Sequence, residues 1–260
     1  MRTREAAVAG MFYPAGAREL ASEVNALMAR QRGPAEPPKA LIAPHAGYVY
    51  SGPVAAAVYS RLRGAEAIRR VVLVGPSHRV AFSGLAVPDA QVFVTPLGAI
   101  RIDDDAVERL LALPSVSRRA DAHMLEHSLE VQLPFLQMLL GEFLLTPVVI
   151  GNASTNAVAT AMDAVWGGPE TLIVVSSDLS HYHRYEEAVV IDKATSGAIL
   201  DLRGGLAPEQ ACGCVGINAL LAVAKRRGLT IEEVDRRNSG DTAGPRDQVV
   251  GYASYALYEN

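Results

Sequence analysis

The chain has 260 residues, half of them hydrophobic, and its 24 basic and 28 acidic residues leave a formal charge of −4. A chain of this length buries about 70% of its surface on folding, and the composition excludes a disordered chain, a collagen-like repeat and a coiled coil. Because it contains no dense run of Lys or Arg, nucleic acid is not expected as a partner.

The predicted elements alternate between helices and short apolar strands. Residues 18–30 place Leu20, Val24, Leu27 and Met28 on one stripe, which indicates a helix with one buried face. The Pro- and Gly-rich residues 32–38 form a connection too short to separate two domains. Strands rich in Val, Ile and Leu follow at 40–43, 71–74, 144–150 and 171–175. Further helices are predicted at 103–113, 126–140, 156–166, 185–202 and 216–227.

The character of these strands predicts the fold class. Short strands that are apolar throughout are typical of a parallel sheet buried on both faces. Residues 249–257 alternate more between polar and apolar, which predicts a half-exposed or antiparallel strand. We therefore expect a single α/β domain over residues 1–260, with three α/β/α layers and a mostly parallel central sheet.

Three of the predicted strands end in a short polar motif that contains histidine. The motifs are residues 44–48 (Pro-His-Ala-Gly-Tyr), 75–78 (Gly-Pro-Ser-His) and 176–181 (Ser-Ser-Asp-Leu-Ser-His). Ligands of open α/β sheets bind beyond the carboxyl ends of the strands, so these separate segments can meet in one crevice. A single histidine is more often structural, but three of the six histidines at strand ends indicate a site.

Histidine and cysteine together suggest a metal site. Neutral imidazoles suit zinc, copper or iron, and a thiolate adds affinity for the softer metals. Cys212 or Cys214 can supply that thiolate, since both precede the predicted helix at 216–227. A free cysteine is also common as a small buried hydrophobe, and no compact zinc-finger spacing is present, so the residues alone indicate a metal only weakly.

Two further segments have two interpretations each. A helix that begins at 126 could bring His127, Glu130 and Gln132 to the crevice, or it could leave Glu130 and Gln132 as solvated surface residues. Residues 238–241 (Asn-Ser-Gly-Asp) have turn chemistry and form either a surface loop or a loop of the site.

Neither a membrane segment nor a disulfide is expected. No apolar run approaches the roughly 18 residues that span a bilayer, and the apolar residues 6–12 are too few for a signal-peptide core. Cys212 and Cys214 are separated by one residue, and such close neighbours form a strained disulfide. We therefore expect reduced thiols, no membrane contact and a cytoplasmic location.

Taken in order, these motifs resemble those of the Memo (mediator of cell motility) family, whose prokaryotic members are called AmmeMemoRadiSam system protein B. The resemblance covers nearly the whole chain, and the family is similar in fold to class III non-heme-iron extradiol dioxygenases. Besides the three histidine motifs, it rests on residues 9–14, 50–52, 126–128, 212–213, 238–241 and 250–252.

The resemblance implies a metal site. In the family pattern two histidines and a cysteine hold the metal, and they match His45, His78 and Cys212. The cysteine takes the place of a carboxylate ligand of the dioxygenases. Cys214 falls where some relatives have histidine, so a swap between the two thiols stays open, with Cys212 preferred.

The resemblance also implies catalytic residues. His181 matches the acid/base histidine of the dioxygenases, Asp178 lies beside it, and His127 belongs to a further motif near the crevice. The first functional hypothesis is therefore a redox enzyme that uses Fe(II) or copper, with zinc as a third candidate, and molecular oxygen. Its substrate would be a small molecule or a peptide. Because a thiolate favours copper, extradiol ring cleavage does not follow from the shared fold.

Two alternatives remain. The cleft of a non-catalytic module could bind a peptide or a partner protein, and a phosphate reader would bring arginines such as Arg79, Arg184 and Arg246 together there. A hydrolase with metal-activated water could use the same ligands. The family's system name implies operation alongside an AMMECR1-like protein and a radical-SAM protein.

Overall fold

The computed structural model describes residues 2–29 and 36–259, so most of the predicted connection at 32–38 lies outside the described residues. The helices are α1 (Ala17–Met28), α2 (Tyr48–Tyr59), α3 (Asp104–Leu111), α4 (Ala120–Met124), α5 (His127–Glu130), α6 (Leu133–Leu140), α7 (Thr155–Ala164), α8 (Tyr185–Leu200) and α9 (Cys214–Arg227). The strands are β1 (Thr3–Arg4), β2 (Ala40–Ala43), β3 (Arg70–Pro76), β4 (Leu85–Val87), β5 (Val92–Thr95), β6 (Gly98–Ile102), β7 (Val116–Arg118), β8 (Leu144–Ile150), β9 (Thr171–Ser176), β10 (His181–His183), β11 (Thr230–Asn238) and β12 (Val249–Tyr258).

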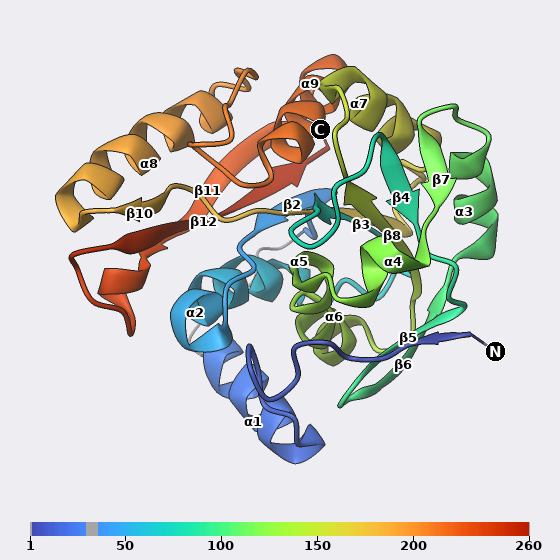
Figure 1. Cartoon of the computed structure of the whole chain (residues 1–260), viewed down its shortest axis with the longest axis horizontal. Coiled ribbons are helices and arrows are strands. Elements are labelled where there is room, and N and C mark those ends of the chain that lie inside the picture. Colours follow the sequence, from blue (N-terminus) through green and yellow to red (C-terminus); the bar gives the residue numbers. More distant parts are fainter. Residues whose placement is uncertain (1, 30–35, 260) are drawn as a thin grey trace.

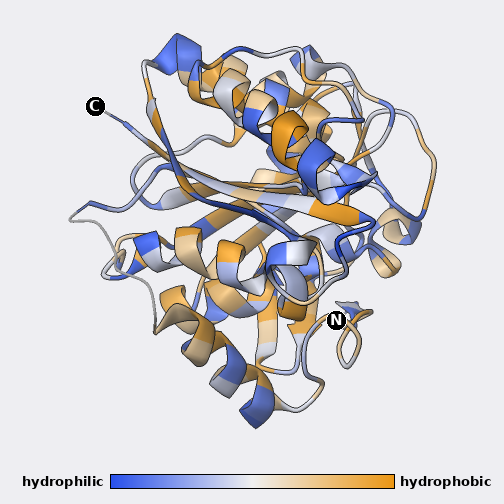
Figure 2. Ribbon diagram, turned by 90° about the vertical axis from the view of Figure 1, so that its left-hand side faces the viewer, coloured by the Kyte–Doolittle hydropathy of each residue, from blue (hydrophilic) through white to orange (hydrophobic). Residues whose placement is uncertain are grey.

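The strands form one twelve-stranded sheet, which Figure 1 shows with α7, α8 and α9 on one side and α1, α2 and α6 on the other. Figure 2 shows the sheet between these two helix layers. The strand order is β1-β5-β6-β8-β3-β9-β2-β12-β10, with β11 beside β12 and β4 beside β7 and β8. This arrangement confirms the predicted three-layer α/β/α fold.

The strands at the centre of the sheet are parallel, whereas β12, further along the strand order, is antiparallel to its neighbours. The strands β8, β3, β9 and β2 run parallel to one another, whereas β12 is antiparallel to β2, β10 and β11. Ala43 pairs with Ser176 and Val74 with Val175, so the carboxyl ends of β2, β9 and β3 lie at one edge. The three histidine motifs therefore leave the sheet side by side.

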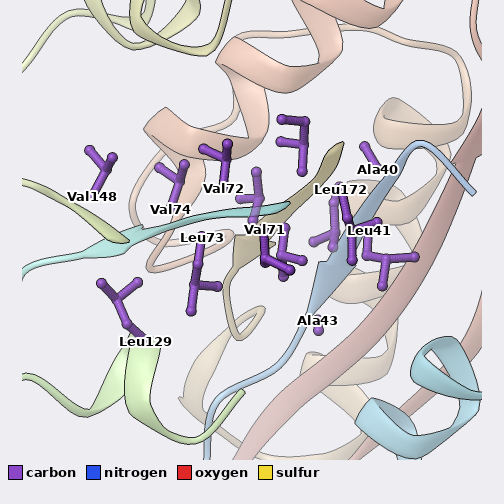
Figure 3. Packing of buried hydrophobic residues seen from close by; sticks show 14 of the residues in the cluster. Ala40, Leu41, Ala43, Val71, Val72, Leu73, Val74, Leu129, Val148 and Leu172 are labelled. Carbon is purple, nitrogen blue, oxygen red and sulfur yellow. The ribbon is translucent and has the colours of Figure 1, made fainter. Parts of the chain in front are cut away.

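The central strands have apolar side chains on both faces. Figure 3 shows Val72 and Val74 of β3 on one face, and Leu73 on the other face toward Leu129 of α5. All four side chains are buried. Because both faces are covered, the strand sequences are continuously apolar, which is the pattern on which the strand predictions depended.

The predicted helix at 126–140 is two helices in the structure. The first, α5, ends at Glu130, and α6 begins at Leu133 with Pro134 in its first turn. Proline lacks an N–H and its ring clashes with the carbonyl four residues earlier, so one continuous helix through Pro134 is disfavoured. The break lets α5 lie across the end of β3 as a separate short element.

The sequence analysis missed the short strands β1, β4–β7 and β10, the short helix α4, and two longer elements, α2 and β11, for which the reason can be identified. Helix α2 is buried on nearly all sides and contains Gly52 and Pro53, so it shows no polar face with helical spacing. Strand β11 pairs with β12 and contains Glu232, Glu233 and Asp235, which are unusual in a strand. The predicted turn at 238–241 is a single turn of 3-10 helix after β11.

Candidate metal centre

A cleft of about 870 Å³ opens at the edge of the sheet where β2, β3 and β9 end. Its lining includes side chains that follow each of these strands, the first residue of α5 and the residues just before α9. This is the crevice expected from the carboxyl ends of parallel strands.

Three imidazoles meet at the floor of the cleft. His45 follows β2, His78 follows β3 and His127 begins α5, and one ligand nitrogen from each lies within 4.8 Å of the others. The approach of α5 requires Gly75 in β3, because a Cβ there would lie 2.8 Å from Leu129 and 2.9 Å from the hydroxyl of Ser128. The sequence analysis placed His127 near the crevice without a ligand role, and the structure places it in the cluster.

The thiol of Cys212 lies at the floor of the cleft beside His45. Its Sγ lies 3.3 Å from Nε2 of His45 and accepts a hydrogen bond from the backbone N–H of Asp178, also at 3.3 Å. Donors that share one ion at about 2.0–2.3 Å lie roughly 3–4 Å apart, so the spacing to His45 fits a shared ion, although Sγ of Cys212 lies outside the group within 4.8 Å that His45, His78 and His127 form. Cys214 is buried in the hydrophobic core and is not among the residues that line the cleft. Cys212 is therefore the thiol that faces the imidazoles.

A buried carboxylate orients His78. Glu126 accepts hydrogen bonds from the backbone N–H of His78 at 2.6 Å and of Ser128 at 2.9 Å, and its Oε1 lies 2.9 Å from Nδ1 of His78. Burial alone would raise the pKa of Glu126, but hydrogen bonds from His78 and Ser128 outweigh it and hold that pKa at about 2. An ionised Glu126 requires the Nδ1–H tautomer of His78, which leaves Nε2 as the free donor for a metal.

A hydroxyl fixes the tautomer of His45 in the same way. Ser176 donates its one proton to the carbonyl of Ser128 at 2.6 Å and lies 2.9 Å from Nδ1 of His45. Nδ1 of His45 must therefore be the donor, and Nε2, on the side of Cys212, carries the free lone pair. Burial, followed by the neighbouring His78 and His127, lowers the pKa of His45 well below its ordinary value. The neutral ring is the form that binds metals.

His127 is the least constrained of the three imidazoles. Burial lowers its pKa to about 4, so the ring is neutral at pH 7. Its Nδ1 is buried without a hydrogen-bond partner, although it lies 3.5 Å from Oε1 of Glu126. The ring also packs against Phe12, with 4.9 Å between the ring centroids. The buried nitrogen without a partner is thus on the side of the Glu126 carboxylate, whose Oε1 also lies beside Nδ1 of His78.

His181 and Asp178 lie in the same cleft but not as a bonded pair. Nδ1–H of His181 donates to the carbonyl of Leu179 at 2.8 Å, so Leu179 and not the neighbouring Asp178 orients the ring. Oδ1 of Asp178 accepts from the backbone N–H of His45 at 2.7 Å. Burial raises the pKa of Asp178 to about 7 against the opposing hydrogen bonds from the backbone of His45 and Ala46.

The two residues left open in the sequence analysis, Glu130 and Gln132, are neither cleft residues nor solvated. Both are fully buried beneath the floor. Glu130 forms an ion pair with Arg4 and accepts a hydrogen bond from Tyr13, and Gln132 donates to the hydroxyl of Ser176 at 2.7 Å. They support the segments that carry the imidazoles.

The partners Glu126 and Ser176 were not predicted as site residues. Glu126 and Ser176 were each noticed only as the first residue of a motif, 126–128 and 176–181. Their position in the sequence could have indicated a role in the site, since each stands next to or within a histidine motif. Charge offers a further observation: among the described residues that line the cleft, none is Lys or Arg.

Fold and site together define a three-layer α/β protein with an imidazole and thiol cluster at the carboxyl edge of its parallel strands. A family model described as Memo-like protein matches residues 4–256. The chain belongs to the Memo family.

Curated relatives agree with this assignment. The chain is similar to a protein named MEMO1 family protein from Aquifex aeolicus, with 37% identity over 97% of this chain and 98% of the relative. It is also 35% identical to one of the same name from Pyrobaculum arsenaticum, over 99% of this chain and 100% of the relative. Among solved structures, it is similar to uncharacterized protein JW3007 from Escherichia coli K12. That match has a TM-score of 0.50 and 11% identity, covers 72% of this chain and 85% of the other, and concerns the fold alone.

Proposed function

We propose that this Memo-family protein is a metal-dependent redox enzyme that holds iron or copper through His45, His78 and Cys212. The observation that carries the proposal is the convergence of imidazoles and a thiol at the floor of a cleft large enough for a substrate. His127 is a further donor within reach of the same point. A thiolate in the set favours copper over iron, and zinc fits the same donors.

The bound metal would supply the redox chemistry, and side chains of the protein would orient its ligands and transfer a proton. Glu126 and Ser176 hold the rings of His78 and His45 with Nε2 free, so the donors need little movement. His181 stands in the same cleft, and burial lowers its pKa, so its ring is neutral at pH 7. Since Leu179 occupies Nδ1, the other nitrogen of His181 can accept and return a proton during turnover.

Metal titration of matched cysteine variants tests this proposal. Cys212→Ser removes the soft donor, and we expect the affinity for copper or iron to fall by more than the roughly 10- to 100-fold seen when an outer hydrogen bond is lost. Cys214→Ser is the control and should leave metal affinity unchanged. Oxygen consumption over a substrate panel should then be lost with Cys212→Ser and retained with Cys214→Ser. Undiminished metal affinity in Cys212→Ser would contradict the ligand set.

The cleft does not favour the phosphate-binding alternative. A phosphate reader needs converging arginines, and Arg79, Arg184 and Arg246 are absent from the described lining of the cleft. Arg246 instead lies over the ring of Tyr185, with 4.3 Å from its guanidinium carbon to the ring centroid. A small-molecule substrate is therefore the better match.

We also propose that the protein acts in the cytoplasm with an AMMECR1-like and a radical-SAM protein. The support is the family resemblance, together with two cysteines that are free thiols. No helix in residues 2–29 and 36–259 is long and apolar enough to cross a membrane. Co-purification of the three proteins from one cell extract would test the partnership, and their separation under gentle conditions would count against it.

A further inference from the structure

Tyr182, on the outer wall of the cleft, has an unusual backbone. Of the non-glycine residues in the described part of the chain, Tyr182 and Leu202 have a positive φ, at 62° and 50°. This left-handed conformation is unfavourable for a bulky side chain. Burial of the Tyr182 ring does not offset this cost, because the residue is 71% exposed. Such an outlier, maintained without a packing reason, points to function.

The chain on both sides of Tyr182 holds it in this conformation. In the pairing of β10 with β12, His181 lies opposite Val250 and His183 opposite Val249, so Tyr182 is the extra residue of a bulge. Before the bulge, Gly251 donates its N–H to the carbonyl of Ser180 at 2.8 Å. A bulge of this kind redirects side chains next to a site.

The bulge places Tyr182 at the rim of the cleft that contains the candidate metal centre. Tyr182 is among the residues that line that cleft, and the centroid of its ring is 5.7 Å from that of His181. Tyr50 of α2, which is 39% exposed, and Tyr252 of β12, which is buried at 2%, line the same space. We call these three side chains the tyrosine wall.

The charge of the cleft limits what the tyrosine wall can receive. The described lining contains no Lys or Arg, and its carboxylates belong to Asp178 and Glu209. In the metal-free protein an anionic group there would find no Lys or Arg partner and would lie near the carboxylate of Glu209. Flat rings pack well against aromatic faces, and a positive charge is also attracted to them.

We propose that Tyr182 is a specificity-determining residue and that the tyrosine wall receives a flat aromatic ring without negative charge. The ring is held beside the imidazole and thiol cluster. That this ring is part of the substrate rests on the proposed redox function, whereas the binding of the ring itself does not depend on a metal.

The test uses three ring compounds of equal size and different charge on the metal-free protein: benzyl alcohol, benzylamine and benzoate. Ligand-observed NMR titration gives each dissociation constant. We expect benzyl alcohol and benzylamine to bind, and benzoate to bind about tenfold more weakly. Equal or tighter binding of benzoate, or no binding of any of the three, would overturn the proposal.

Variants of Tyr182 and Leu202, the two residues with a left-handed backbone, test whether ring binding depends on Tyr182. Tyr182→Asn removes the ring and tolerates the left-handed backbone, so benzyl alcohol should bind about three- to tenfold more weakly while the Tm rises by roughly 2 °C. Tyr182→Trp should retain binding. Leu202→Asn is the matched control, since Leu202 is left-handed but absent from the cleft lining, and it should leave ring binding unchanged.

The outcomes separate this inference from the proposed function. Unchanged binding of benzyl alcohol in Tyr182→Asn would overturn the role of Tyr182 even if the metal centre is active. Ring binding that depends on Tyr182 in a protein without metal-dependent oxygen consumption would support the wall and contradict only the redox proposal.

Discussion

The floor of the cleft and its tyrosine wall are built in opposite ways. The floor consists of His45, His78, His127 and Cys212, and it stands on strand ends, on α5 and on the segment just before α9. The ring nitrogens of His45 and His78 that face away from the cleft are held by Ser176 and Glu126. The wall stands on α2, β10 and β12 and leaves Tyr182 exposed. Hydrogen bonding fixes the direction of the floor's donors, whereas the wall relies on backbone conformation to present a ring.

This difference has a physical basis. A metal ion requires donors within a few tenths of an ångström of their places, and buried hydrogen bonds supply that accuracy. A ring that stacks on an apolar partner tolerates more variation, so an exposed side chain on a bulge suffices. Changes beneath the floor should therefore affect folding and metal binding together, and changes in the wall should affect ligand choice alone.

The largest expected effect comes from the ion pair under the floor. Arg4→Met leaves the fully buried Glu130 carboxylate without its cationic partner, and breaking a buried pair costs about 3–5 kcal/mol. Urea unfolding measures this loss. Arg118→Met is the control, because its partner Glu108 is exposed and such surface pairs contribute about 0–1 kcal/mol. Equal losses in the two variants would mean that Glu130 is reached by water.

The next largest effect is a pH dependence of the free energy of unfolding, which originates at His123, behind the floor of the cleft. His123 is buried with Nε2 3.0 Å from the carbonyl of Ala86, and burial lowers its pKa to about 4. Because the folded-state pKa lies below the unfolded value of about 6.5, the stability is fully present above pH 6.5 and decreases as the pH falls toward 4. Below pH 4 the loss levels off at about 3 kcal/mol, since each unit of pKa difference corresponds to about 1.4 kcal/mol.

Unfolding free energies measured between pH 4 and 7 check this expectation. His123→Gln keeps an N–H for the carbonyl of Ala86 and removes the titrating group, so it should flatten the pH dependence by about one proton in that interval. A slope identical to that of the unchanged protein would mean that other groups cause the acid sensitivity.

Much of the fold could be predicted because apolar strand patterns and their end motifs are local. Strands 40–43 and 144–150 agree with β2 and β8, and the parallel order of the centre then brings His45, His78 and His181 to one edge. Elements whose pattern depends on tertiary contacts were missed. Helix α2 has no exposed stripe, and β11 carries charges that only its position beside β12 explains.

The partners of the site residues were harder to predict than the residues themselves. Ser176 meets His45 across 131 residues, and Glu126 meets His78 across 48. No spacing rule links such pairs, because the pairing follows from the strand order and from the break between α5 and α6. The ligand set itself stays a prediction until a metal is measured.

A smaller effect, on metal binding, is expected from the carboxylate beneath His78. Glu126→Gln keeps the size of the side chain but allows the other tautomer of His78, because an amide can donate as well as accept. We expect metal affinity to fall about 10- to 100-fold, as is usual when an orienting partner is lost. Glu108→Gln, an exposed residue, is the control for the loss of one negative charge. Isothermal titration with zinc or copper measures both variants.

The smallest effect concerns a single hydroxyl in the floor. Ser176→Ala removes the acceptor of His45 Nδ1–H and one of the acceptors of the Gln132 side-chain amide, which keeps its bond to the carbonyl of Pro44 at 2.9 Å. The variant therefore leaves the buried Nδ1–H of His45 without a partner and the Gln132 amide with one bond fewer. The free energy of unfolding should fall by about 1–3 kcal/mol, and metal affinity should weaken because His45 is no longer held in one orientation. Ser254→Ala is the matched control, since the Ser254 hydroxyl is equally buried but has no hydrogen-bond partner. Its removal should be neutral or stabilising and should leave metal binding unchanged. If the two alanine variants unfolded at the same urea concentration, the hydroxyl of Ser176 would not be holding the floor, and the accuracy of the donors would have to come from packing alone.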